Sequence, residues 1–179
     1  MPGSIPGRRT KSLYVMRVLV ILSMACVLVS ATLTKPKTEI PSDAVRMYRA
    51  IMLYSGMYQV PRHVAFNIAH LETTYRGPQD SIYNPSRASK AGALGPMQIM
   101  YRYASYFAER KVTKAELRDS IEFNVNLSMK ILAENYKRYK SWAKAAGAYN
   151  TGRPIINRYA REAVKKDYQR NWIIVKDSL

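Results

Sequence analysis

The chain has 179 residues, enough for one domain with a sizeable core, and its 29 Lys and Arg against 12 Asp and Glu give a formal net charge of +17. A single cysteine, Cys26, excludes an intrachain disulfide and a cysteine metal cluster. The two histidines, His63 and His70, do not form the paired pattern of zinc hydrolases, and we expect no metal and no cofactor. Charge of this size suits nucleic acid, anionic membranes or acidic polymers, so it does not identify the partner.

Residues 1–34 have the pattern of a targeting segment. A basic lead precedes residues 13–33, which are largely apolar and contain only one charge, Arg17. This length lies between a signal-peptide core and a full membrane span, so both cleavage after Ala31 and retention as an inner-membrane anchor remain open. The excess of basic residues before the segment places the N-terminus in the cytoplasm. We therefore expect the remainder on the periplasmic side of the inner membrane, or exported after cleavage.

Residues 35–41 are expected to form a linker and residues 42–179 the functional domain. Apolar residues in this domain recur at helical spacing, with capping residues and glycines between the periodic stretches. The pattern predicts helices over residues 42–56, 61–72, 96–110, 119–139 and 141–150, and a last one from residue 154. Residues 77–85 carry Gly-Pro and Asn-Pro turn signals. No segment alternates for long enough to predict a strand, so the expected fold class is all-α.

Glu72 is the candidate for acid chemistry. It lies at the edge of the apolar face of the second predicted helix, where desolvation disfavours the carboxylate. It is also near the C-terminus of that helix, where the helix dipole acts in the same direction. A carboxyl group that stays protonated near pH 7 can donate a proton to the oxygen of a glycosidic bond. A solvated glutamate at a helix end is the commoner case, so the neighbouring residues must decide.

Glu72 heads an ordered series of short motifs. The series continues with Asn84-Pro85, Ala88-Ser89, Gly92-Ala93, Gly95, Met97-Gln98-Ile99-Met100, Asn124-Val125 and Ala148-Tyr149-Asn150-Thr151-Gly152. It resembles the soluble lytic transglycosylase (SLT, goose-lysozyme-like) family, in which the acid heads a Glu-Ser motif and Gly-Leu-Met-Gln and Ala-Tyr-Asn motifs follow. The resemblance covers about residues 42–168.

The resemblance implies a lysozyme-like helical domain that acts on peptidoglycan glycan strands. The implied reaction cleaves the β-1,4 bond between N-acetylmuramic acid and N-acetylglucosamine and forms 1,6-anhydromuramic acid, with Glu72 as general acid and base. It needs no water and no second carboxylate. By the same resemblance Met97, Gln98 and Met100 line the substrate cleft, and Tyr149 and Asn150 contact the substrate or steady the acid. A bacterial protein that remodels the wall for a secretion or pilus machine would use this reaction. A phage protein that acts in entry or lysis would use it too.

Three departures from the family pattern concern the substrate rather than the acid. Thr73 replaces the family serine and keeps the hydroxyl, Pro96 replaces a leucine, and Tyr101 replaces a proline. Residues 73–83 lengthen the connection between Glu72 and the next motif, so we expect a longer loop near the cleft.

Alternative interpretations of these residues remain open. Asp80 could activate water in a hydrolysing muramidase, although a solvated aspartate is typical of such turns. Gln98 could merely cap a helix, and Tyr149 could merely pack in the core. The charge alone would also fit a non-catalytic module that binds cell wall or nucleic acid, whereas the resemblance predicts no nucleic acid.

Overall fold

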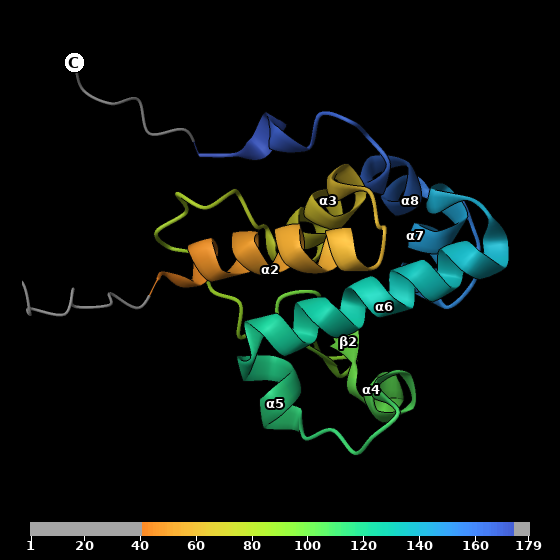
Figure 1. Ribbon diagram of the computed structural model, residues 1–179, viewed down its shortest axis with the longest axis horizontal. Helices are drawn as coiled ribbons and strands as arrows, with labels where there is room; N and C mark the ends of the chain where they lie inside the picture. Colours follow the sequence, from red (N-terminus) through yellow and green to blue (C-terminus); the bar gives the residue numbers. More distant parts are fainter. Residues whose placement is uncertain (1–40, 174–179) are drawn as a thin grey trace, which may run out of the picture. The chain divides into compact units, whose positions relative to one another are not determined.

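The computed structural model describes residues 41–173, so the predicted targeting segment (1–34) and nearly all of the predicted linker (35–41) lie outside the described residues. The helices in this part are α2 (Asp43–Met57), α3 (Arg62–Thr73), α4 (Tyr101–Ala108), α5 (Lys114–Asp119), α6 (Ile121–Tyr139), α7 (Trp142–Thr151), α8 (Arg158–Ala163) and the 3-10 helix η1 (Tyr168–Asn171) (Figure 1). Two strands, β1 (Ala93–Leu94) and β2 (Ile99–Met100), pair antiparallel. Within residues 41–173, no helix is both long and apolar enough to cross a membrane.

Three of the predicted helices begin at serine caps. The hydroxyls of Ser42, Ser120 and Ser141 accept hydrogen bonds from backbone N–H groups in the first turns of α2, α6 and α7. Gly152 ends α7 in the left-handed conformation, with a φ of 74°. The predictions for these helices are confirmed to within about two residues at each end.

The prediction that a helix begins at residue 96 is wrong, whereas the helical fold class is confirmed for residues 41–173 apart from one small hairpin. Residues 93–100 form a hairpin with Ala93 opposite Met100, and α4 begins only at Tyr101. In the turn of this hairpin, Gly95 and Gln98 have positive φ values of 77° and 50°, which no helix contains. Proline is favoured in tight turns as well as at the first position of a helix, so Pro96 does not distinguish the two.

Two further elements differ from the expectation. The short helix α5 (Lys114–Asp119) was not predicted, and Thr113 caps it by accepting from the backbone N–H of Glu116. The last predicted helix starts at Arg158 rather than at residue 154, because Asn157 caps it. The fold is therefore mainly helical, with one small hairpin.

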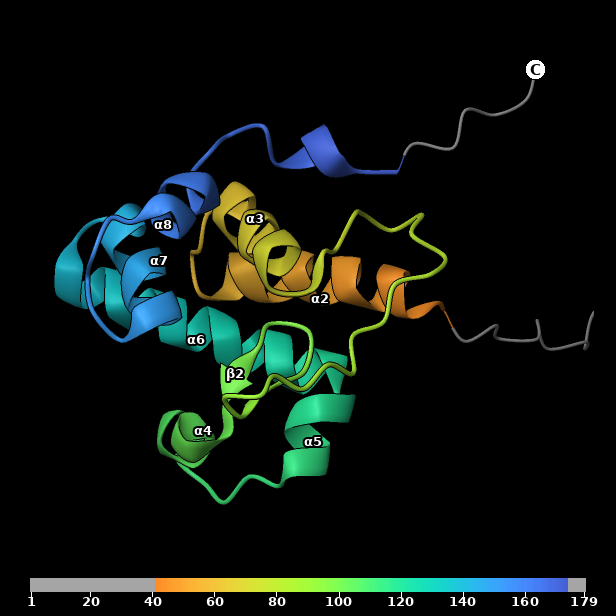
Figure 2. The same ribbon diagram turned by 180° about the vertical axis from the view of Figure 1, so that it is seen from behind.

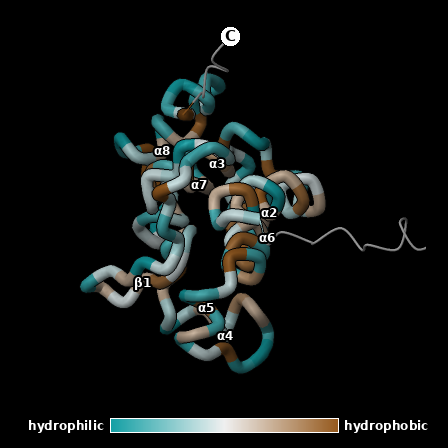
Figure 3. The backbone as a smooth tube through the Cα atoms, turned by 90° about the vertical axis from the view of Figure 1, so that its left-hand side faces the viewer, coloured by the Kyte–Doolittle hydropathy of each residue, from teal (hydrophilic) through white to brown (hydrophobic). Residues whose placement is uncertain are grey.

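Helix α6 separates two hydrophobic clusters. One face of α6 supplies Val125, Met129 and Leu132 to a core shared with α2, α3 and α8. The other face supplies Leu127 and Ile131 to a smaller cluster under the hairpin, α4 and α5. Figure 1 and Figure 2 show α2 and α3 on one side of α6 and α4, α5 and β2 on the other. In Figure 3 the apolar stretches of α2 and α6 lie next to each other, as their packing requires.

The C-terminal end of the described chain packs over α3. The Trp172 ring meets Phe66 of α3 edge-on at a centroid distance of 5.3 Å, and the backbone N–H of Ile173 donates to the carbonyl of Arg76 at 2.9 Å. Helix α3 is thus covered on several sides, which leaves its C-terminal end, where Glu72 lies, as the part that faces the hairpin.

Candidate active site

The Glu72 carboxyl lies in the last turn of α3 and is largely withdrawn from water. Burial is the main influence on it and raises its pKa to about 7, although a hydrogen bond from Tyr159 acts in the opposite direction. The chain leaves the helix at Thr74, which adopts the left-handed conformation with a φ of 59°. Near neutral pH, Glu72 is therefore present in both its protonated and its ionised form. A carboxyl group in this state is suited both to donate and to accept a proton.

Tyr159 of α8 holds this carboxyl. Its hydroxyl donates to Glu72 Oε1 at 2.5 Å, across 87 positions of sequence. In the sequence Tyr159 looks like an apolar contact of the last helix and belongs to none of the motifs. Only the packing of α8 against α3 brings the two side chains together. Among the described residues no hydrogen bond reaches Oε2, so this oxygen is available to a substrate.

Thr73 connects the acid-bearing end of α3 to the hairpin turn. Its hydroxyl lies 2.8 Å from the carbonyl of Pro96 and 3.2 Å from that of Ala69, and it has one proton to donate. The hydroxyl of Tyr83, at the end of the lengthened loop, is 3.1 Å from Thr73 Oγ1. The hydroxyl that Thr73 shares with the family serine therefore fixes the turn relative to Glu72.

Asn124 of α6 holds the same turn from the opposite direction. Its Oδ1 accepts from the backbone N–H of Met97 at 2.9 Å, and its Nδ2 donates to the carbonyls of Leu94 and Leu117 at 2.9 and 2.8 Å. A Cβ on Gly95 would lie 2.5 Å from Asn124 Nδ2, so only glycine fits there. The positive φ of Gly95 imposes the same requirement.

Tyr149 of α7 provides a third connection to the turn. Its hydroxyl donates to the carbonyl of Met97 at 2.6 Å and lies 3.0 Å from Ser128 Oγ. Burial raises the pKa of Tyr149 far above its ordinary value, and the nearby charge of Glu72 adds to this shift. The structure therefore places the phenol close enough to Glu72 to sense its ionisation.

The other sequence-predicted site residues lie in different environments. Met97 has no exposed surface, so its side chain belongs to the core rather than to the lining of a cleft. Gln98 is half-buried, and its Nε2 donates to the carbonyls of Gly95 at 2.9 Å and Arg87 at 3.3 Å. Asn150 is exposed at the end of α7, where Asn157 Nδ2 donates to its Oδ1 at 3.4 Å.

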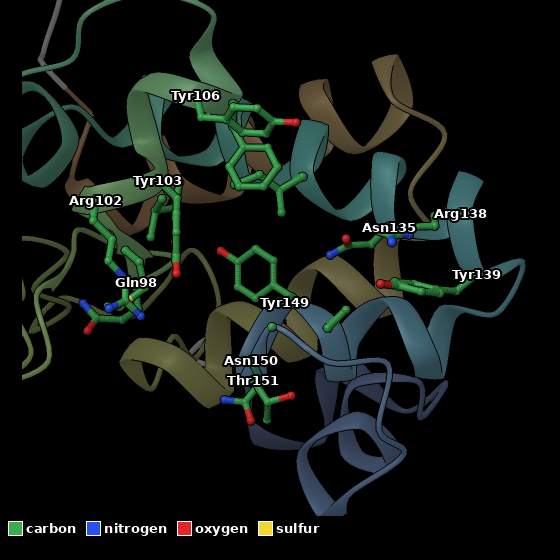
Figure 4. A pocket seen from close by; sticks show the side chains of 16 residues that line it. Gln98, Arg102, Tyr103, Tyr106, Asn135, Arg138, Tyr139, Tyr149, Asn150 and Thr151 are labelled. Atoms are coloured by element: carbon green, nitrogen blue, oxygen red, sulfur yellow. The ribbon is translucent and has the colours of Figure 1, made fainter.

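A pocket of about 570 Å³ opens beside these groups, between α4, α6 and α7. Gln98, Met100, Tyr149 and Asn150 line it, and neither Met97 nor Glu72 does. Figure 4 shows Tyr149 in the middle of this pocket, surrounded by labelled side chains of α4, α6 and α7. Glu72 is thus not part of the pocket lining, but it lies near the pocket, since its charge contributes to the raised pKa of Tyr149.

Asp80 does not behave as a solvated turn residue, so that interpretation is wrong. Its side chain is 2% exposed, and its two oxygens each accept from the guanidinium of Arg76 at 3.1 Å. The positive charge of Arg76 compensates the burial of this carboxylate. Asp80 therefore stabilises the lengthened loop, and both of its carboxylate oxygens are bound by Arg76.

The comparisons with known proteins agree with the order of the motifs. The family described as "Transglycosylase SLT domain" matches residues 51–172, from the middle of α2 to the end of the described core. No curated protein and no solved structure matches the chain. The family match covers more than half of the 179 residues and includes Glu72, the hairpin and α7. The protein therefore belongs to the transglycosylase SLT domain family, whose lytic-transglycosylase type of activity acts on peptidoglycan.

Proposed function

We propose that the protein is a peptidoglycan lytic transglycosylase in which Glu72 is the single general acid and base. The observation that carries this proposal is the half-buried Glu72 carboxyl with a pKa of about 7, held by the hydroxyl of Tyr159. The bond cleaved is the β-1,4 linkage between N-acetylmuramic acid and N-acetylglucosamine, and the muramic product carries a 1,6-anhydro ring.

The reaction requires one proton to move out of Glu72 and one to move back. Protonated Glu72 donates to the bridging oxygen, and the bond from that oxygen to C1 of muramic acid breaks with its electron pair on the leaving sugar. The Glu72 carboxylate then accepts the proton of the C6 hydroxyl of the same muramic acid, whose oxygen bonds to C1. Tyr159 stabilises the carboxylate between the two steps by its hydrogen bond to Oε1. No water is consumed, and Glu72 returns to its protonated form.

The arrangement of Asp80 supports the one-carboxylate route. A hydrolase of the inverting or retaining class needs a second carboxylate that can activate water or attack the sugar. Asp80 is buried in its ion pair with Arg76, and its use as a base would break both of those hydrogen bonds. Its loss should accordingly damage the loop rather than the chemistry.

Digestion of purified peptidoglycan in ¹⁸O-labelled water tests the reaction. We expect 1,6-anhydromuramyl ends that carry no label and are one water lighter than hydrolysed ends. Glu72→Gln should lose activity by about 10²- to 10⁴-fold, because the amide cannot donate the proton. Reducing-end muramyl products that carry the solvent label would instead identify a hydrolase, and wild-type turnover in Glu72→Gln would exclude the assigned acid.

We also propose that residues 13–33 take the catalytic domain to the periplasmic side of the inner membrane, where peptidoglycan lies. The support is the basic lead and the apolar run in the sequence. Protease added to spheroplasts should digest the domain, whereas a product that stays protected would contradict this location. The identity of the genes that lie beside the gene of this protein would show whether it serves a secretion, pilus or phage assembly.

A further inference from the structure

The pocket beside Glu72 carries positive charge and no compensating acid. Of its described lining residues, two are arginines, Arg102 from α4 and Arg138 from α6, and none is aspartate or glutamate. Figure 4 shows the two arginines on different sides of the central Tyr149. A concave surface lined by charge of one sign concentrates its field, so this pocket favours an anionic ligand.

Both arginines are oriented by aromatic rings rather than by acids. The guanidinium carbon of Arg102 lies 4.7 Å from the ring centre of Tyr103, and that of Arg138 lies 5.5 Å from the ring centre of Tyr139. Within residues 41–173 neither arginine forms an ion pair, whereas Arg110, just beyond the end of α4, pairs with Glu116. A guanidinium stacked on a ring keeps its N–H edge free, and that edge matches a carboxylate in two-point geometry.

The chemistry of peptidoglycan identifies the anion. In a strand that carries peptides the sugars are neutral, because the lactyl carboxyl of each muramic acid is bound to its peptide as an amide. They therefore give an arginine no charge to bind, whereas the attached peptides end in carboxylates. Tyr149, in the middle of the pocket, is close enough to Glu72 for the charge of Glu72 to raise the pKa of Tyr149, so a peptide on the muramic acid at the cleavage point starts close to the pocket. A volume of about 570 Å³ exceeds the needs of one sugar and admits several residues of peptide.

We infer that Arg102 and Arg138 bind carboxylates of the peptide carried by the muramic acid, so that the enzyme selects peptide-bearing strands with free carboxylates. This inference rests on the proposed function for its substrate. It adds a specificity that the acid chemistry of Glu72 does not require, because the bond that breaks lies in the neutral glycan.

Three substrates from one batch of peptidoglycan test the inference. The first keeps its native peptides, and the second has the peptide carboxylates converted to methylamides of nearly the same size. The third has its peptides removed by an amidase and the lactyl carboxylates that this exposes converted to methylamides as well. For the full-length enzyme we expect kcat/KM on native strands to exceed that on methylamide strands by about three- to tenfold, the range for one or two partly exposed charge-assisted contacts. The double variant Arg102→Gln/Arg138→Gln should bring this ratio close to one.

Arg49→Gln is the matched control, because Arg49 is an exposed arginine of α2 that lies outside the pocket lining and makes no ion pair within the described chain. It should keep the wild-type ratio. Equal cleavage of native and methylamide strands by the wild type would overturn the inference, and so would a double variant that retains the preference. A third outcome would also overturn the inference: the enzyme prefers both peptide-bearing substrates over stripped strands but does not discriminate between those two. The pocket would then recognise the size of the peptide and not its charge.

Binding separates failure of this inference from failure of the proposed function. Cosedimentation of the full-length Glu72→Gln variant with native and methylamide walls needs no turnover. A wild type that cleaves nothing, with charge-dependent binding still present, would reject the lyase and keep the pocket assignment. Cleavage with no charge dependence in either assay would keep the lyase and reject the pocket assignment.

Discussion

Tyr159→Phe should move the alkaline limb of the pH–rate profile upward. Burial raises the pKa of Glu72 to about 7, and the hydrogen bond from Tyr159 is the one influence that lowers it. Phenylalanine keeps the ring and removes the donor at 2.5 Å from Oε1, so the carboxylate loses stabilisation that the protonated form does not need. Because the proposed first step requires protonated Glu72, activity should persist to higher pH as this pKa rises.

The size of the shift follows from the strength of the bond. A hydrogen bond to a charged group contributes about 1.5 kcal/mol or more, and one pKa unit corresponds to about 1.4 kcal/mol. The midpoint of the alkaline limb in kcat/KM should therefore move from near 7 to about 8. The variant should also lose about tenfold in kcat at its own optimum, since the acid is no longer held in position.

The assay is kcat/KM for release of soluble muropeptides between pH 5 and pH 9, with Tyr168→Phe as the control. Tyr168 stacks on Phe66 at a centroid distance of 5.2 Å, and no hydrogen bond of its hydroxyl occurs within the described chain. Its variant should keep the wild-type limb. If the limb of Tyr159→Phe stays in place or moves to lower pH, Tyr159 does not stabilise the carboxylate and the assignment of the acid loses its support.

Three further predictions concern stability. The pKa of Glu72 is raised from 4.5 to about 7 in the fold, so its contribution to the free energy of unfolding is complete below pH 4.5 and is lost as the pH rises to 7. In urea unfolding, the stability of Glu72→Gln relative to the wild type should therefore increase by up to about 3 kcal/mol between pH 4 and pH 8. Gly95→Ala should cost several kcal/mol more than Gly92→Ala, because both have positive φ but only at Gly95 does the new Cβ meet neighbours; equal denaturation midpoints would contradict this. Thr73→Val should lower stability by about 1–3 kcal/mol by leaving the Pro96 carbonyl without its donor, whereas Thr73→Ser keeps the bond, and thermal melts of the two variants should differ accordingly.

Local signals in the sequence were sufficient for much of the helical framework. Ser42, Ser120 and Ser141 bind backbone groups within their own helices, so their effect does not depend on the rest of the fold. Gly152 likewise ends α7 through its own conformation. The order of the motifs predicted the family, which the family match over residues 51–172 confirms.

The elements that were missed depend on partners far away in the sequence. Pro96 lies in a turn rather than a helix because Thr73 and Asn124, from two different helices, bind the turn residues. Tyr159 reaches Glu72 only after α8 packs on α3. The pairing of Asp80 with Arg76 did leave a signal, since opposite charges four residues apart can meet, but the turn-rich composition favoured a solvated loop.

In the proposed mechanism, the hairpin turn makes catalysis dependent on the core. Thr73, Asn124 and Tyr149 come from α3, α6 and α7, and all three bind backbone groups between Leu94 and Met97. The wall of the pocket and the helix end that carries the acid are thus fixed to one another through a few buried hydrogen bonds. A change at any of these bonds should lower stability and kcat together, because it shifts the acid relative to the bound sugar, and displacements of about 1 Å can cost about a hundredfold in rate. A loss of activity without loss of stability is expected only for groups that act on the substrate or on the proton itself, and this difference distinguishes the supporting residues from the catalytic one.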